Sequence, residues 1–135
     1  MTDFDKVPLT EIISIISSHG YITDEQVDHL WRRMKADGRI DREEANVLFA
    51  INSVVVNKQN SDKWKNFFIQ SIASHLLMDP FTPRTIDDHE WQWLKGVIGS
   101  VENIDENVRV LLIELKKKAL NVPMDFRTFL SDAGL

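Results

Sequence analysis

The stretch KADGRIDREE, which runs from Lys35 to Glu44, carries the densest set of structural signals in this sequence. Its Asp-Gly pair is typical of a helix end, because glycine adopts the positive φ that closes the last turn without strain. Asp41 is followed three residues later by Glu44, which is the spacing of a capping box at a helix start. The stretch therefore predicts a tight corner between two helices.

The same corner is also a candidate site for a divalent cation, because carboxylates are ligands that hard cations prefer. When Gly38 is aligned with the turn glycine of an EF-hand loop, Asp37 falls at the fifth ligand position. Asp41 and Glu44 then fall at the ninth and twelfth positions. The first and third positions are an arginine and a lysine, which repel calcium, so the ligand count argues against an EF-hand loop. We keep Asp37, Asp41 and Glu44 as a candidate cation site beside the purely structural interpretation.

Apolar residues recur at helical spacing on both sides of the corner, and few glycines or prolines interrupt them. This pattern predicts an all-α globule of about seven helices. Residues suited to helix N-caps precede the second, third, fifth and sixth expected helices, namely Thr23, Asp41, Asp87 and Asp105. In the second helix the spacing assigns four large side chains to one buried face, namely Val27, Leu30, Trp31 and Met34.

The helix pairs at about 21–57 and 85–121 match each other at a constant offset of 64 residues. The identical pairs are Ile22–Ile86, Asp24–Asp88, Ile40–Ile104, Asp41–Asp105, Leu48–Leu112 and Asn57–Asn121. The first of these pairs precedes the N-caps, where each isoleucine can pack against the fourth helical residue. We predict two pseudo-repeated helix-corner-helix units within a single domain over residues 1–135.

Composition excludes several classes of function. The chain has 135 residues, a net charge of -5 and no cysteine. An acidic chain is a poor match for nucleic acid, and without cysteine it forms neither disulfides nor thiolate zinc sites. No apolar stretch approaches the roughly 20 residues of a membrane span, and the first residues show no signal-peptide pattern. We expect a cytoplasmic protein without a catalytic motif or a tightly bound cofactor.

The segment ADGRIDREEANVL resembles the signature of the TerB tellurite-resistance family. The matching positions are Asp37, Gly38, Ile40 and Glu44, and Asp41 lies inside the same corner. The resemblance implies an all-helical, internally duplicated cytoplasmic domain that is associated with stress response and binds divalent cations through acidic side chains. The second corner, SVENIDENV, departs from this pattern because it lacks both the glycine and the glutamate.

Trp93 is the candidate for contact with a partner. Trp91 and Trp93 are two residues apart, about 200° around a helix, so both cannot face the core. Trp91 shares its face with Leu94 and Ile98, and a partly exposed indole at Trp93 is then suited to a protein partner or a second copy of the chain.

Three functions follow from these observations. The leading hypothesis is a non-enzymatic interaction or scaffold module with a protein partner. The alternative is a divalent-cation-binding protein that uses the acidic corner. An enzyme would need a perturbed acid or base in a cleft, for which the sequence shows no motif.

Overall fold

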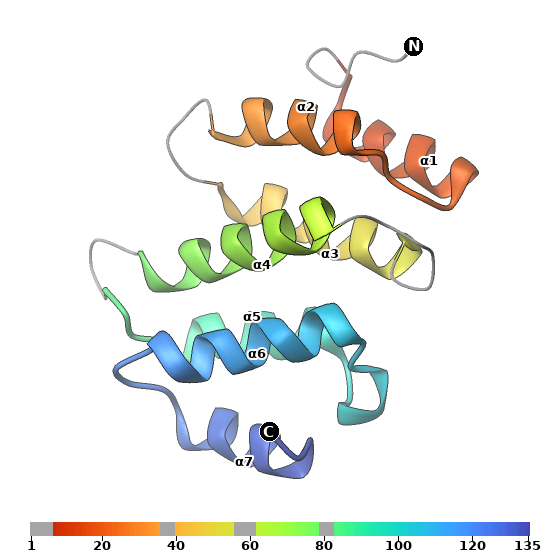
Figure 1. The fold of residues 1–135 in the computed structure, drawn as a ribbon. Helices are drawn as coiled ribbons and strands as arrows, with labels where there is room; N and C mark the ends of the chain where they lie inside the picture. Colours follow the sequence, from red (N-terminus) through yellow and green to blue (C-terminus); the bar gives the residue numbers. More distant parts are fainter. Residues whose placement is uncertain (1–6, 36–39, 56–61, 79–82) are drawn as a thin grey trace. The chain divides into compact units, whose positions relative to one another are not determined.

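The structure is a computed structural model of the chain, and it describes residues 7–35, 40–55, 62–78 and 83–135. These residues form seven α-helices and one short 3-10 helix, η1 (Val101–Asn103) (Figure 1). The α-helices are α1 (Leu9–His19), α2 (Asp24–Lys35), α3 (Arg42–Val55), α4 (Asp62–Leu77), α5 (Asp88–Ile98), α6 (Glu106–Lys118) and α7 (Met124–Asp132). The prediction of an all-α fold with about seven helices is confirmed over the described residues.

Two compact units make up the chain, an N-terminal unit (Met1–Ser71) and a C-terminal unit (Ile72–Leu135), and the division falls inside α4. Each unit holds one of the helix pairs that match in the sequence, α2 with α3 in the first and α5 with α6 in the second. The single domain over residues 1–135 stays a prediction.

The predicted helix starts are confirmed by their capping interactions. Thr23 Oγ1 accepts from the Gln26 N–H at 3.1 Å, and the Gln26 side-chain oxygen accepts from the Thr23 N–H at 2.9 Å. Asp87 forms the same reciprocal box with Glu90. Each cap occupies a backbone N–H that would otherwise have no partner within the helix, which stabilises the helix by about 1 kcal/mol.

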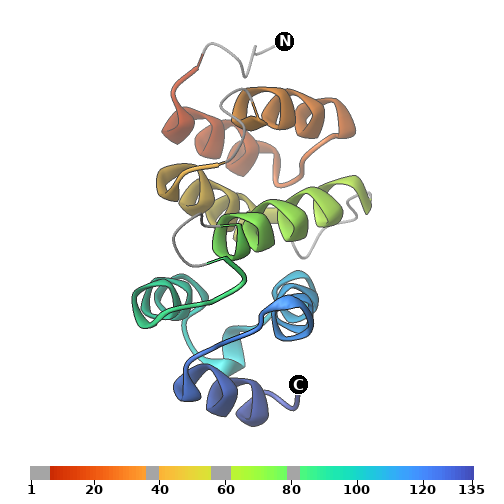
Figure 2. The same cartoon turned by 90° about the vertical axis from the view of Figure 1, so that its left-hand side faces the viewer.

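In the N-terminal unit, α1 lies beside α2 and α3 lies beside α4, and α1 also contacts α3 (Figures 1 and 2). The rings of Phe49 in α3 and Phe68 in α4 meet edge to face, with centroids 5.1 Å apart. Lys63 in α4 forms an ion pair with Asp28 in α2 at 2.8 Å, and this hydrogen bond raises the pKa of Lys63. Aromatic packing thus joins α3 to α4, while a surface charge pair joins α4 to α2.

In the C-terminal unit, Trp91 joins α5 to α7. Its ring centroid lies 5.0 Å from that of Phe126 and 5.2 Å from that of Phe129, both in edge-to-face geometry. The indole Nε1 donates to Asp125 Oδ2 at 2.7 Å, and Lys95 Nζ reaches the same oxygen at 3.1 Å. These two donors, the Trp91 hydrogen bond first, lower the pKa of Asp125. The prediction that Trp91 faces the core is confirmed, since its side chain is fully buried.

The segment before α5 is tied to the end of α6. Arg84 has a positive φ of 58°, and its guanidinium Nε and Nη2 donate to the carbonyl oxygen of Lys118 at 3.3 and 3.2 Å. The Arg84 carbonyl oxygen accepts from the Leu120 N–H at 2.7 Å, and Thr85 forms an isolated parallel bridge with Asn121. These bonds hold the chain that leaves α6 and so position the turn into α7.

The structure corrects the sequence prediction for Trp31, which is 53% exposed rather than buried. Val27, Leu30 and Met34 are buried as expected. Leu30 and Met34 lie on one side of Val27 around the helix, whereas Trp31 lies about 40° to the other side. Trp31 is therefore at the margin of the apolar stripe, and the neighbouring helices leave much of it in solvent.

Candidate functional site

The acidic corner has the geometry of a helix cap in its described part. Asp41 Oδ1 accepts from the Glu44 N–H at 2.7 Å, and Glu44 Oε1 accepts from the Asp41 N–H at 2.9 Å. Ile40, immediately before the cap, is buried. The capping box that the sequence predicts at the start of α3 is therefore confirmed.

The cation site that the sequence predicts at Asp37, Asp41 and Glu44 is only partly described. Asp37 and Gly38 lie outside the described residues, whereas Asp41 and Glu44 are brought together by the capping box. Within the described ranges, no group of three or more His, Asp or Glu side chains is arranged to hold a metal ion. The cation site stays a prediction, whereas the capping role of Asp41 and Glu44 is defined by their two hydrogen bonds.

Asp41→Ala is expected to lower the free energy of unfolding by about 1 kcal/mol, because it removes the side-chain acceptor at the start of α3. The loss should be the same with and without calcium, magnesium, manganese or zinc, as measured by thermal melting. Asp105→Ala is the matched control, since Asp105 Oδ1 accepts from the Val108 N–H at 2.9 Å in the second corner. A loss in Asp41→Ala that is seen only with a divalent cation would instead favour the cation site.

Trp93 lies about 200° around α5 from Trp91, and its side chain is partly exposed. The indole is partly covered by His75, which lies in the part of α4 that belongs to the same C-terminal unit. The ring of His75, near the end of α4, meets the indole edge to face with centroids 5.5 Å apart. One turn beyond His75, Met78 is 65% exposed. His75, Met78 and Trp93 are hereafter called the Trp93 surface.

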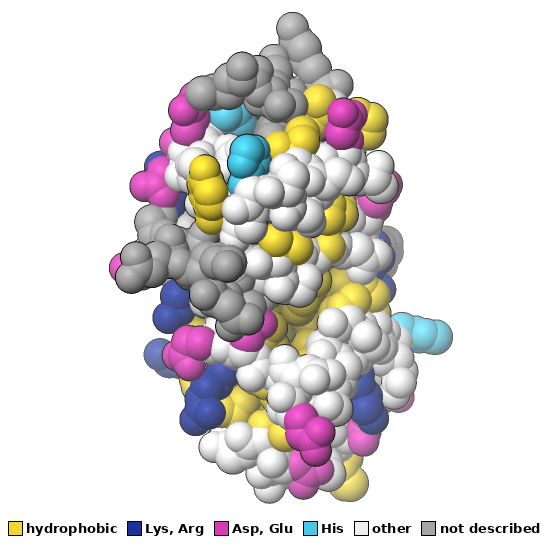
Figure 3. Space-filling view, turned by 90° about the vertical axis from the view of Figure 1, so that its right-hand side faces the viewer, with side chains coloured by type: hydrophobic (Ala, Val, Ile, Leu, Met, Phe, Trp, Pro, Cys, Tyr) yellow, Lys and Arg dark blue, Asp and Glu magenta, His cyan; other side chains and the backbone are white. Residues whose placement is uncertain are grey.

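The sequence did not identify two other exposed aromatic residues, Tyr21 and Trp31, in the N-terminal unit. The ring of Tyr21 lies against His19, with centroids 5.7 Å apart. In the upper part of the view in Figure 3, hydrophobic side chains (yellow) and histidine side chains (cyan) lie next to one another on the surface. The signal that could have identified Trp31 is its place at the edge of the apolar stripe rather than at its centre.

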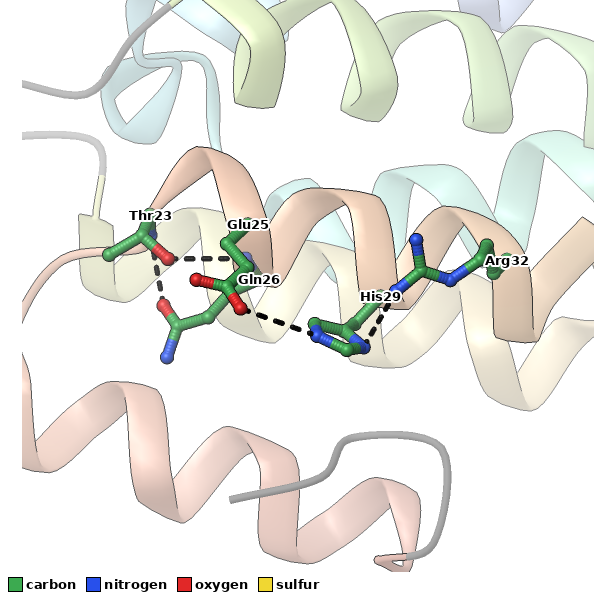
Figure 4. A network of polar contacts seen from close by, with 5 residues as sticks. All are labelled: Thr23, Glu25, Gln26, His29 and Arg32. Atoms are coloured by element: carbon green, nitrogen blue, oxygen red, sulfur yellow. Dashed lines mark hydrogen bonds and ion pairs between the residues drawn. The ribbon is translucent and has the colours of Figure 1, made fainter. Parts of the chain in front are cut away.

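A polar network runs along the exposed side of α2 (Figure 4). Arg32 Nη2 lies 2.9 Å from His29 Nδ1, and Glu25 Oε1 lies 3.9 Å from His29 Nε2. Because arginine only donates, Nδ1 of His29 is the acceptor in the contact with Arg32. All three residues are on one helix at spacings of three and four, so the network supports α2 locally.

A groove of about 370 Å³ lies between the end of α6 and α7 in the C-terminal unit. Its apolar lining includes Phe126 and Leu130, which are buried, and Leu120, which is 64% exposed. Lys116 from α6 and Arg127 from α7 also line it, and both are exposed. The groove therefore combines an apolar floor with two positive charges.

Comparisons of the chain with protein-family models, with curated proteins and with solved structures found no match. The resemblance to the TerB family therefore rests on the residues of the corner and stays a prediction. Among the helices that the structure describes, none has the length and apolar character needed to cross a membrane.

Proposed function

We propose that this protein is a non-enzymatic helical interaction module of the TerB-like kind, acting in a cytoplasmic stress response, with the Trp93 surface as its partner contact. The observation that carries the proposal is the partly exposed indole of Trp93, held edge to face by His75. Tryptophan and methionine are enriched at protein interfaces, and tryptophan is among the residues that contribute most to binding.

The packing of Trp93 supports this role. α5 already buries Trp91, Leu94 and Ile98, so its core face is complete without a second indole. The contact with His75 holds the ring in one place, which lowers the conformational entropy that a partner contact would cost. The exposed thioether of Met78 extends the same surface with a side chain that adapts to different partner shapes.

The duplicated architecture of the TerB-like proposal is supported by the positions of helix starts and buried residues. α2 and α3 begin at residues 24 and 42, and α5 and α6 begin at 88 and 106, which is the offset of 64 found in the sequence. The same offset relates seven pairs of buried residues, namely Ile22–Ile86, Val27–Trp91, Leu30–Leu94, Met34–Ile98, Val47–Leu111, Leu48–Leu112 and Ile51–Leu115. Two helix pairs that bury equivalent positions fit an internal repeat.

Trp93→Ala is expected to reduce partner binding by about tenfold or more, because loss of a central indole removes on the order of 2 kcal/mol of binding energy. A photo-crosslinking residue placed at Met78 reports this in cells that make the protein naturally. The measurement is the yield of the crosslinked partner, identified by mass spectrometry, together with self-association by sedimentation velocity.

Trp31→Ala is the matched control, since it removes an exposed indole from the N-terminal unit and should leave the crosslinked product unchanged. Thermal melting of Trp93→Ala should stay close to that of the parent. An unchanged yield combined with a large fall in melting temperature would show that Trp93 is a core residue, and the proposed contact would be wrong. The absence of any crosslinked protein and of self-association would refute the interaction function.

A further inference from the structure

α6, which lies in front of α5 in Figure 1, has apolar side chains on two opposite sides. Its inner side is the buried stripe of Val108, Leu111, Leu112 and Leu115. About 180° around the helix, a second stripe follows the spacing of one helix face. This outer stripe consists of Glu106, Val110, Ile113 and Lys117. Two apolar side chains therefore lie at its centre, and one charged side chain lies at each end.

Ile113 is the more exposed of the two apolar residues in the outer stripe, at 44%. At the offset of 64 residues that relates the two helix pairs, its counterpart in α3 is Phe49. Phe49 is only 8% exposed and packs edge to face against Phe68 of α4. Another helix thus covers this position in the N-terminal unit, whereas Ile113 stays in contact with solvent. An apolar side chain that is left in water beside a second one is suited to a contact with another molecule.

The two ends of the outer stripe carry opposite charges. Glu106 lies in the first turn of α6 and Lys117 in the last, and both are exposed. The ion pair within α6, between Glu114 and Lys118, uses neither of them. The stripe is symmetric about its middle, so two antiparallel copies would place each Glu106 opposite Lys117 of the other copy. Each Val110 would then face Ile113 of the other copy, whereas a parallel pair would bring like charges together.

We infer that the outer stripe of α6 pairs with the same stripe of a second copy of this chain, with the two helices antiparallel about a twofold axis. Such an interface uses one self-complementary surface twice, which is the usual way in which dimers form. Ile113 of each copy is then covered by α6 of the other, much as Phe49 is covered by α4. Antiparallel helix dipoles also favour this direction over the parallel one.

The dimer is expected to be weak, because a contact between single helices buries much less than a standard interface. Arg109 and Lys116 lie about 70–90° to one side of the outer stripe. In an antiparallel pair this side meets the same side of the other copy, so their like charges reduce the affinity further. We expect a dissociation constant on the order of 0.1 mM.

Sedimentation equilibrium of the full chain, at roughly 10 µM to 1 mM, measures this association. Ile113→Asp is expected to weaken it at least about tenfold, because it places a carboxylate of each copy in the apolar centre. Glu106→Lys and Lys117→Glu should each weaken it about tenfold, since each puts like charges at both ends of the contact. The double variant Glu106→Lys, Lys117→Glu should regain the affinity of the parent, because the pairs re-form with their signs reversed.

Arg127→Glu is the matched control, because Arg127 is an exposed cation on α7 outside the outer stripe, and this variant should associate as the parent does. Circular dichroism should confirm that every variant folds. A chain that stays monomeric at about 1 mM, or equal association by Ile113→Asp, would overturn the inference. So would a double variant that associates no better than the single charge reversals. A monomeric chain whose photo-crosslinking residue at Ile113 captures a different protein would assign the outer stripe to that protein instead.

This inference does not depend on the Trp93 surface. Trp93→Ala should dimerise through α6 as the parent does, and Ile113→Asp should retain the product crosslinked at Met78. Each proposal can therefore fail while the other stands. Self-association that is lost in Trp93→Ala and kept in Ile113→Asp would belong to the Trp93 surface and would overturn the assignment to α6.

Discussion

Trp91→Ala is expected to lower the free energy of unfolding by about 3–5 kcal/mol, which is the range for removing a large aromatic side chain from a core. The indole is fully buried and meets the rings of both Phe126 and Phe129 edge to face, so its removal leaves a cavity between α5 and α7. A natural domain has only about 5–15 kcal/mol of stability in total. The change should therefore bring the C-terminal unit close to unfolding, as measured by urea denaturation followed by circular dichroism.

The matched control is Trp31→Ala, which removes an indole that is half exposed and should change stability by no more than about 1 kcal/mol. Equal losses in the two variants would contradict the assignment of Trp91 to the core. Trp91→Phe should lose less than the alanine variant, because a phenyl ring keeps much of the aromatic contact while the bond to Asp125 is lost.

The stability difference between the parent protein and Trp91→Phe is expected to depend on pH. The Trp91 hydrogen bond and Lys95 lower the folded-state pKa of Asp125, so its contribution to stability is present above the unfolded pKa of the carboxyl group. That contribution is lost as pH falls through the folded pKa. The difference in melting temperature between parent and Trp91→Phe should therefore shrink in acid.

Asn52→Ala is expected to lower the free energy of unfolding by roughly 1–3 kcal/mol, because it removes the acceptor of a buried donor. Asn52 and Trp64 are each 1% exposed, and the Trp64 Nε1 donates to Asn52 Oδ1 at 3.2 Å between α3 and α4. Without the carboxamide, the indole N–H stays in the core of the N-terminal unit and loses this acceptor. The loss is measured by urea denaturation with both tryptophan fluorescence and circular dichroism.

Ser53→Ala, at the next and exposed position of α3, should change stability by no more than about 0.5 kcal/mol. A double-mutant cycle with Trp64→Phe isolates the pair, and its interaction energy should be on the order of 1 kcal/mol. An interaction energy of zero would show that the two side chains contribute to stability independently.

Helix starts were predictable because capping is local. The oxygen of Thr23, Asp41, Asp87 or Asp105 bonds a backbone N–H three residues away, so the sequence contains both partners. The buried stripes were equally predictable at their centres, as Leu30 and Leu94 show. At the margins the same pattern failed, and Trp31 was assigned to the core although more than half of it is exposed.

The candidate sites also contain some features that the local sequence predicted and others that it did not. The reciprocal hydrogen bonds of Asp41 and Glu44 could be predicted from their spacing, because each carboxylate and the backbone N–H that it accepts from lie within one helical turn. Partial exposure of Trp93 followed from its angle around α5, whereas the ring that holds it comes from His75 in another helix. The groove was not predictable, since its two charges and its apolar floor belong to helices whose approach no local pattern specifies.

The sequence by itself therefore determined the all-α class, the capped helix starts and the centres of the buried faces, because these depend on backbone geometry within one or two turns. Tertiary structure alone decided which marginal side chains are covered and which distant polar groups meet. Trp31 stays exposed while Trp93 is partly covered, because burial at the edge of a helix depends on the shape of its neighbours. Asn52 pairs with Trp64 because the packing of α3 against α4 brings the two side chains together.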